Sequence, residues 1–466
     1  MYPIEVLYAK QTGGPKYMAL ARAIRGAVRN AALAPGDRLP PVRGLAGRIG
    51  VTPGTVARTY SLLCDEGVLQ ATVGRGTFVA GEGISAEPAI RLSPRRFDLT
   101  AWRWPDMGQS ALIRAALARA TGGEYAALRH AVYPPGSDDD AAPRAMLGWL
   151  DTERTGTIRI EDIQLTHGAQ AAVQTVMHAV LRGARPVVLV DELSAPVFAR
   201  VAGLLRAEVV AVPMDREGVL PRALDDVVSG TGAQLLCTAS EAHDPTTLST
   251  PRARREAIAA VARRHDLHVL DYDCTRTGAA DGPGYRALLP ERGWHVGMVA
   301  ASLSPWLEAG LVVAPVGQAA RLKQVADDAG TSLRAPFADA QAALLDKVEM
   351  RDVHDRARDE LNRYLSAAGE ALKAHRPVWR RDAAHLWLPL PRGWTASGFV
   401  AAASAAGVTV SPATDFALPD AHAPRAVRIA IDAQIAFDCF VHAITILADL
   451  LDRGPQATAD TTAGPL

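Results

Sequence analysis

The chain has 466 residues, which is room for two or three domains and a large core. Its 50 basic and 50 acidic residues balance overall, but residues 1–80 hold ten lysines and arginines against four acidic residues. A basic first segment on a mildly acidic remainder suits a polyanionic partner at one end. The four cysteines lack metal-ligand spacing, and we find no signal peptide and no apolar run of membrane-spanning length. We therefore expect a reduced, cytoplasmic protein with no metal and no membrane partner.

The first eighty residues predict a winged helix-turn-helix. Residues 16–32 have the apolar spacing of a helix, and a second helix carries Leu45, Ala46 and Ile49 on one face. A short turn at residues 50–51 separates this helix from the next one.

The third helix has clear start signals. Thr52 is placed as its N-cap and Pro53 as its first residue, where the missing N–H of proline is not needed. Its expected buried face consists of Val56, Tyr60 and Leu63. Two β-prone runs, 68–73 and 77–79, then flank a Gly-Arg-Gly tip.

A helix offered to the major groove beside an arginine-tipped wing is the arrangement of a DNA-binding module. A purely structural three-helix module is the alternative. The expected DNA contacts are Arg43 from the second helix, Thr52 and Thr55 at the start of the third, and Arg75 and Gly76 on the wing. Arg58 is a further candidate, although a helical arginine is often only solvated.

The remainder of the chain predicts an α/β domain. Residues 81–97 are poor in apolar side chains and read as a linker, and the domain is expected over residues 98–453. Apolar runs bounded by helical patterns indicate a mainly parallel sheet covered by helices. These runs are residues 186–190, 208–213, 234–238, 267–271 and 310–314. A small α+β subdomain is expected over about 366–453, and a disordered tail over 454–466.

Both parts resemble a known family. The motifs LP-x-VR, TPGTVARTY and GRGTFV of residues 10–80 resemble the GntR regulators. The body carries LTHGAQAAV, VDELSAPVFARVAG, MDREGVLP and WHVGMVAASLSPWLEAGLVVAP in the order of the fold-type I aminotransferases, which use pyridoxal 5′-phosphate (PLP). Their fusion resembles the MocR-type regulators. The resemblance implies a homodimer whose two heads recognise paired half-sites on an operator.

The positions that hold PLP in this family have changed. The ungapped alignment places Ala301 at the Schiff-base lysine and Glu308 at the phosphate-binding arginine, and no lysine lies between Lys16 and Lys323. Three further exchanges agree with this loss: Ala195 for a tyrosine, Asp244 for the asparagine of N-P-T-G, and Cys274 for a tyrosine. We therefore expect no covalent PLP and no transamination.

Other cleft positions keep their family character. Asp271 is in register with the aspartate that pairs with the pyridinium nitrogen, although a shift of one residue puts Leu270 there. Residues Gly168, Ala169 and Gln170 open a helix that could bind an anion, or form only a structural turn. Arg428 matches the arginine that grips a substrate carboxylate. It either binds a carboxylate-bearing effector or pairs internally, with Asp432, Asp271 or Glu308.

The leading hypothesis is a DNA-binding transcriptional regulator with a catalytically inactive, aminotransferase-like body for dimerisation and effector sensing. The alternative is a regulator that binds PLP, or an active PLP-dependent aminotransferase with an unusual site. A purely structural interaction protein is disfavoured by the intact head.

Overall fold

The chain folds into two compact units, residues 1–95 and 96–466, in the computed structural model. The structure describes residues 4–5, 8, 16–29, 32–34, 36–65, 68–72, 76–79, 96–122, 141–298, 309–334, 336–419 and 421–455.

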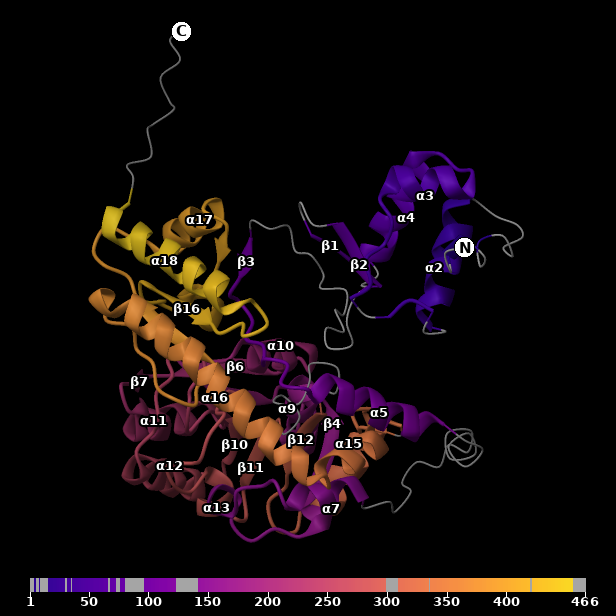
Figure 1. The fold of residues 1–466 in the computed structure, drawn as a ribbon. Helices are drawn as coiled ribbons and strands as arrows, with labels where there is room; N and C mark the ends of the chain where they lie inside the picture. Colours follow the sequence, from indigo (N-terminus) through magenta and orange to yellow (C-terminus); the bar gives the residue numbers. More distant parts are fainter. Residues whose placement is uncertain are drawn as a thin grey trace. The chain divides into compact units, whose positions relative to one another are not determined.

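The first unit contains three helices and a hairpin. They are α2 (Lys16–Arg29), α3 (Val42–Ile49), α4 (Pro53–Asp65), β1 (Leu69–Thr72) and β2 (Gly76–Val79) (Figure 1). The strands pair antiparallel, with Leu69 opposite Val79 and Thr72 opposite Gly76. The predicted winged helix-turn-helix is confirmed.

Local sequence signals account for this unit. Val56, Tyr60 and Leu63 are buried as predicted, together with Leu20 and Leu45. The α3–α4 turn needs a left-handed residue, which Gly50 supplies at φ 68°. The tip of the wing, residues 73–75, lies outside the described residues.

The second unit is built on a seven-stranded sheet. From one edge to the other, its strands are β4 (Ile163–His167), β12 (Ala309–Val313), β11 (Gly293–Gly297), β10 (His268–Asp273), β9 (Leu235–Thr238), β5 (Val187–Asp191) and β6 (Glu208–Val212). All five apolar runs singled out in the sequence form strands of this sheet. The predicted parallel pairing holds for four of the six pairs, and β12 runs antiparallel to both of its neighbours.

Helices cover the sheet. One cluster of buried side chains joins the sheet to α9 (Gly168–Val180), α10 (Pro196–Leu204) and α14 (Ala319–Asp328). A second joins it to α11 (Pro221–Thr231), α12 (Arg252–Arg264) and α13 (Tyr285–Leu288). A third involves α5 (Gln109–Thr121), α7 (Ala141–Leu147) and α15 (Phe337–Leu345) (Figure 1). Short elements complete this part: α8 (Thr152–Thr155), β7 (Met214–Asp215) and β8 (Gly218–Val219).

A smaller sheet follows in the chain. It has the order β13 (His385–Pro389), β16 (Ala426–Ala430), β15 (Ser411–Pro412) and is antiparallel. Its core is shared with the long α16 (Val348–Ala371), α17 (Ala396–Ala405) and α18 (Phe437–Arg453).

The start of the second unit differs from the expected linker. Phe97 belongs to β3 (Phe97–Asp98), which pairs parallel with β14 (Val408–Thr409) beside the smaller sheet. The expected linker therefore extended one residue too far, because a two-residue strand leaves no periodic signal in the sequence. Of the expected tail, residues 456–466 lie outside the described residues.

Among the residues that the structure describes, no helix combines the length and apolarity needed to cross a membrane. The same residues contain no group of three or more histidine, cysteine or acidic side chains arranged to hold a metal ion.

Candidate DNA interface and cofactor cleft

The start of α4 is an open helix terminus. The N–H of Thr55 donates to the Thr52 side-chain oxygen at 3.3 Å, so Thr52 caps the helix as predicted. The two hydroxyl oxygens are 2.9 Å apart, and neither α3 nor α4 has an acidic residue in its first turn. Arg43 is exposed in the first turn of α3. These groups could meet phosphate without nearby negative charge.

Arg58 has a different environment. Its guanidinium carbon lies 4.1 Å from the centroid of the Tyr17 ring, which stacks it on α2. This contact holds the side chain along the helix surface. Gly76 begins β2, whereas Arg75 lies outside the described residues.

In the second unit, α9 begins directly where β4 ends. Gly168 opens the helix at φ 77°, followed by Ala169 and Gln170 in the first turn. A Cβ on Gly310 would lie 2.2 Å from the Gly168 carbonyl oxygen, so β12 passes this turn in close contact. The close approach supports the structural reading of the turn, which nevertheless presents helix N–H groups.

The wall beside this turn is apolar. Ala195 precedes Pro196 at the start of α10 and is buried in one cluster with Phe198, Leu270 and Cys274. Side chains alternate along a strand, so Leu270 and Cys274 share one face of β10 and Asp271 points to the other. A leucine offers no charge partner for a pyridinium nitrogen.

Asp271 is fully buried and fully hydrogen-bonded on that other face. The backbone N–H and hydroxyl of Ser240 donate to its Oδ1 at 3.0 and 2.8 Å, and the N–H of Tyr285 donates to Oδ2 at 3.1 Å. Arg154 Nη2 also donates to Oδ2, at 3.0 Å. Burial raises the pKa of Asp271, but the Arg154 guanidinium, His295 and the hydrogen bond from the Ser240 N–H together more than offset this effect and leave the pKa below its usual value.

Arg154 and Asp271 belong to a larger buried cluster of three arginines and three acids. Arg154 also contacts Glu241 at 3.3 Å and Asp273 at 3.5 Å. The other ion pairs are Arg255–Glu241 at 3.0 Å, Arg276–Asp273 at 2.6 Å and Arg276–Glu241 at 3.7 Å. The formal charges cancel, so the cluster is a neutral unit within the protein.

Arg428 makes an internal ion pair. Its Nη1 donates to both oxygens of Asp244, at 2.9 and 3.1 Å, and both side chains are 11% exposed. Its Nη2 donates to the Thr100 carbonyl, and its guanidinium carbon lies 4.9 Å from the Phe416 ring centroid. Burial raises the pKa of Asp244, but Arg428 more than offsets this effect and leaves the pKa below its usual value.

The loop that carries Asp244 is fixed by a buried histidine. His243 Nε2 lies 2.9 Å from Asp191 Oδ2, and its Nδ1 lies 2.7 Å from the Thr246 hydroxyl. Thr238 donates to the same Asp191 oxygen at 2.8 Å. Asp244 is therefore held rigidly opposite Arg428.

Comparisons with known proteins agree with both halves. Residues 16–79 match the gntR family of bacterial regulatory proteins. The chain is 22% identical over 460 residues to YdeF, an uncharacterised HTH-type transcriptional regulator of Bacillus subtilis, covering 94% of this chain and 95% of YdeF. It is 28% identical to PdxR, the HTH-type pyridoxine biosynthesis transcriptional regulator of Corynebacterium glutamicum, over 64% of this chain and 66% of PdxR.

The fold of the body is that of aminotransferases. An archaeal alanine:glyoxylate aminotransferase superposes with a TM-score of 0.67 at 18% identity, covering 77% of this chain and 91% of that enzyme. This likeness concerns the fold alone.

The chain is a transcriptional regulator with a GntR-type DNA-binding head and an aminotransferase-like body, a combination consistent with the MocR-type regulators.

Two expectations for the regulator's cleft are corrected. Asp271 does not lie in the cleft, because it faces Arg154 across the sheet and the one-residue shift that puts Leu270 there holds. Arg428 does pair internally, but its partner is Asp244 rather than Asp432 or Asp271. Asp432 is bound by Arg103 at 2.6 Å. The third expected partner, Glu308, lies outside the described residues, as does Ala301.

Sequence reasoning missed the buried charge cluster of the regulator. Arg154, Glu241 and Asp273 come from three separate segments, none of which has a recognisable motif. The one available signal was the acid pair Asp271 and Asp273, two residues apart at the end of an apolar run. Their shared face requires a cationic partner once the strand is buried.

Proposed function

We propose that the regulator binds operator DNA as a homodimer in the cytoplasm, and that its aminotransferase-like body is catalytically inert and holds no covalent PLP. The observation that carries the second part is the Asp244–Arg428 pair. The arginine that would hold a substrate carboxylate is engaged by a carboxylate of the chain itself.

Two sequence features support an inert body. Lysine is absent between Lys16 and Lys323, so no lysine of the segment around Ala301 can form a Schiff base. Leu270 replaces the charge partner that a pyridinium nitrogen needs. The residues of the cleft therefore do not fit PLP as these enzymes hold it.

The dimer follows from the resemblance, because fold-type I bodies complete their clefts across a two-fold axis. Two heads on one dimer suit paired half-sites. A carboxylate-bearing effector at Arg428 would compete with Asp244, since both Asp244 oxygens accept from Nη1 of Arg428.

We expect the purified regulator to be colourless. A Schiff base with PLP absorbs in the visible and near-ultraviolet and is converted by borohydride to a stable pyridoxyl-lysine. The measurement is an absorption spectrum with added PLP, before and after reduction, followed by mass spectrometry of the peptides. A pyridoxyl-peptide would overturn the inert body.

Reversible PLP binding without reductive capture would instead identify a vitamin B6-sensing regulator. This is the second candidate, and the similarity to PdxR favours it.

Arg43→Ala is expected to weaken operator binding and to flatten its salt dependence. A lost phosphate contact reduces the slope of log K against log salt by about one unit. Arg75→Ala should have a similar effect if the wing reaches the DNA. The measurement is a fluorescence-anisotropy titration at several salt concentrations.

The matched control is Arg252→Ala. Arg252 is an exposed arginine of α12 in the second unit, paired with Glu256. The Arg252→Ala variant should bind the operator as tightly as the wild type does. Wild-type affinity in both Arg43→Ala and Arg75→Ala would refute the placement of the interface.

A further inference from the structure

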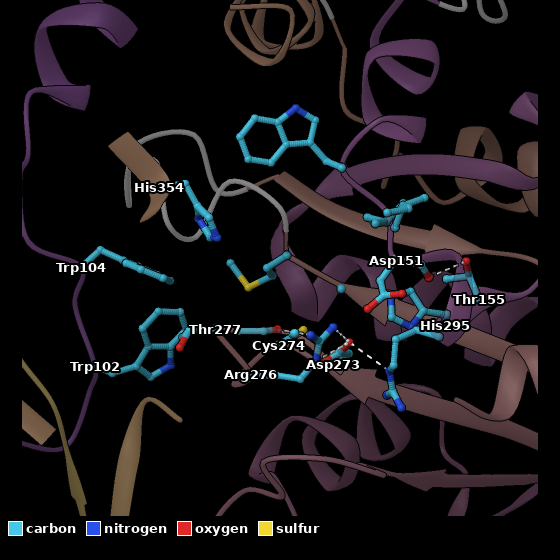
Figure 2. Close-up of a pocket in the computed structure, with 18 residues that line it drawn as sticks. Trp102, Trp104, Asp151, Thr155, Asp273, Cys274, Arg276, Thr277, His295 and His354 are labelled. Carbon is cyan, nitrogen blue, oxygen red and sulfur yellow. Dashed lines mark hydrogen bonds and ion pairs between the residues drawn. The ribbon is translucent and has the colours of Figure 1, made fainter. Parts of the chain in front are cut away.

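A cavity of about 210 Å³ lies at the ends of β10 and β11 (Figure 2). Of the expected cleft residues that the structure describes, Cys274 alone lines it. Ala195, Asp244 and Arg428 lie elsewhere, and Asp273 lines the cavity from the β10 face opposite Leu270. Apart from Cys274, the described lining of the cavity therefore differs from the residues expected to hold a cofactor.

One side of the cavity is aromatic. Trp102, Trp104 and His354 lie together there, opposite Asp151 and His295 (Figure 2). The ring centroids of Trp102 and Trp104 are 6.2 Å apart, and those of Trp104 and His354 are 5.8 Å apart. Such faces favour a flat, aromatic occupant.

The cavity is also lined by buried polar atoms that have no hydrogen-bond partner. Three belong to side chains at least nine-tenths buried: Trp104 Nε1, Thr277 Oγ1 and His295 Nδ1. Buried polar groups are nearly always paired in native proteins. Three such atoms around one cavity indicate a ligand that supplies their partners.

The indole N–H of Trp104 can only donate, so the ligand must carry an acceptor. The threonine hydroxyl can donate or accept. Burial lowers the pKa of His295, so its ring is neutral near pH 7 and has one nitrogen free to accept. The charged side chains of the lining balance, Asp151 and Asp273 against Arg154 and Arg276, which leaves no net charge to neutralise an ionic ligand.

Size limits the ligand further. A cavity of 150 Å³ is known to hold benzene, so about 210 Å³ holds one substituted ring. The walls come from both parts of the second unit. Trp102 and Trp104 follow β3, which pairs beside the smaller sheet, whereas Thr277 and His295 belong to the large-sheet region. An occupant would therefore contact both parts.

We propose that this cavity binds an uncharged, planar heteroaromatic molecule of one substituted ring, and that this is the effector site of the regulator. The effector role rests on the proposed function, whereas binding itself does not.

The test measures binding to the full-length protein without DNA, so that failure of the DNA proposal does not affect it. The probes are nicotinamide, pyrazinamide and benzamide, with nicotinate as the anionic counterpart. Quenching of tryptophan fluorescence and thermal shift are the readouts. We expect saturable binding of at least one uncharged probe at millimolar or lower concentration, and weaker binding of nicotinate than of nicotinamide.

Thr277→Val keeps the side-chain shape and removes an unpartnered hydroxyl. The variant should have an unchanged or higher melting temperature and should bind the probe roughly tenfold more weakly than the wild type does. Trp102→Leu should weaken binding of the probe further. Trp379 is half-buried and lies outside the cavity, so Trp379→Leu should leave binding unchanged. No saturable binding of any probe, or equal affinity in Thr277→Val, Trp102→Leu and wild type, would overturn the proposal.

Discussion

Replacing Arg428 by methionine should lower the free energy of unfolding of residues 96–466 by about 3–5 kcal/mol, because it leaves the Asp244 carboxylate buried without its partner. Methionine keeps an apolar stem near Phe416, so the change reports mainly on the lost charge. The measurement is chemical denaturation followed by a probe of the second unit, since two units need not unfold together.

Arg103→Met is the matched control. Arg103 also pairs with an aspartate, Asp432, but its side chain is 36% exposed and solvent screens the pair. The loss of unfolding free energy in Arg103→Met should be clearly smaller than the loss in Arg428→Met. The double variant Arg428→Met with Asp244→Leu should recover much of the stability, because replacing both partners by apolar groups removes the stranded charge. Equal losses in the two single arginine variants would contradict a special role for the Asp244 pair.

The same pair predicts a chemical rescue. Asp244→Ala leaves Arg428 without its carboxylate, and added formate should bind there and raise the melting temperature of the variant. Wild-type protein should not respond, because Asp244 already occupies Nη1 of Arg428 and the Thr100 carbonyl occupies Nη2. A formate response of equal size in both proteins, or none in the variant, would argue against an arginine closed by an internal carboxylate.

Local signals were sufficient to predict the head. The helix from Pro53, its cap at Thr52 and the buried spacing of Val56, Tyr60 and Leu63 involve neighbouring residues, and the structure reproduces them. The strands of the body were predictable for the same reason, since a buried strand reads as a continuous apolar run. The reversal of β12 was not, because strand direction depends on the path of the chain.

The cleft was predicted less well because side-chain faces depend on register. A shift of one residue moves every side chain of a strand to the other face, and this decides between Leu270 and Asp271. The partner of Arg428 depends on tertiary structure, since Asp244 is 184 residues away in the chain. Both residues were singled out, but nothing local connects them.

Arg154→Met is the second change with a large expected effect. Arg154 is 1% exposed and contacts three carboxylates, so its loss leaves Glu241, Asp271 and Asp273 buried with two arginines. We expect a loss of about 3–5 kcal/mol at pH 7. Arg263→Met, at an exposed pair with Glu291, is the control and should change stability little.

The pH dependence separates this electrostatic loss from a loss of packing. The pKa values of Asp271 and Asp273 lie below their usual values in the folded protein, although burial raises both. Arg154 contributes to the lowering for both residues, and for Asp273 the contribution of Arg276 is larger. Carboxylates of this kind contribute stability above their unfolded pKa, about 3.9, and lose it as the pH falls through the folded value. The difference in unfolding free energy between wild type and Arg154→Met should therefore be largest near neutral pH and shrink as the pH falls and the stranded carboxylates of the variant take up protons. A difference that stays constant from pH 7 to the acid limit of folding would mean that Arg154 stabilises the unit by filling space rather than by its charge.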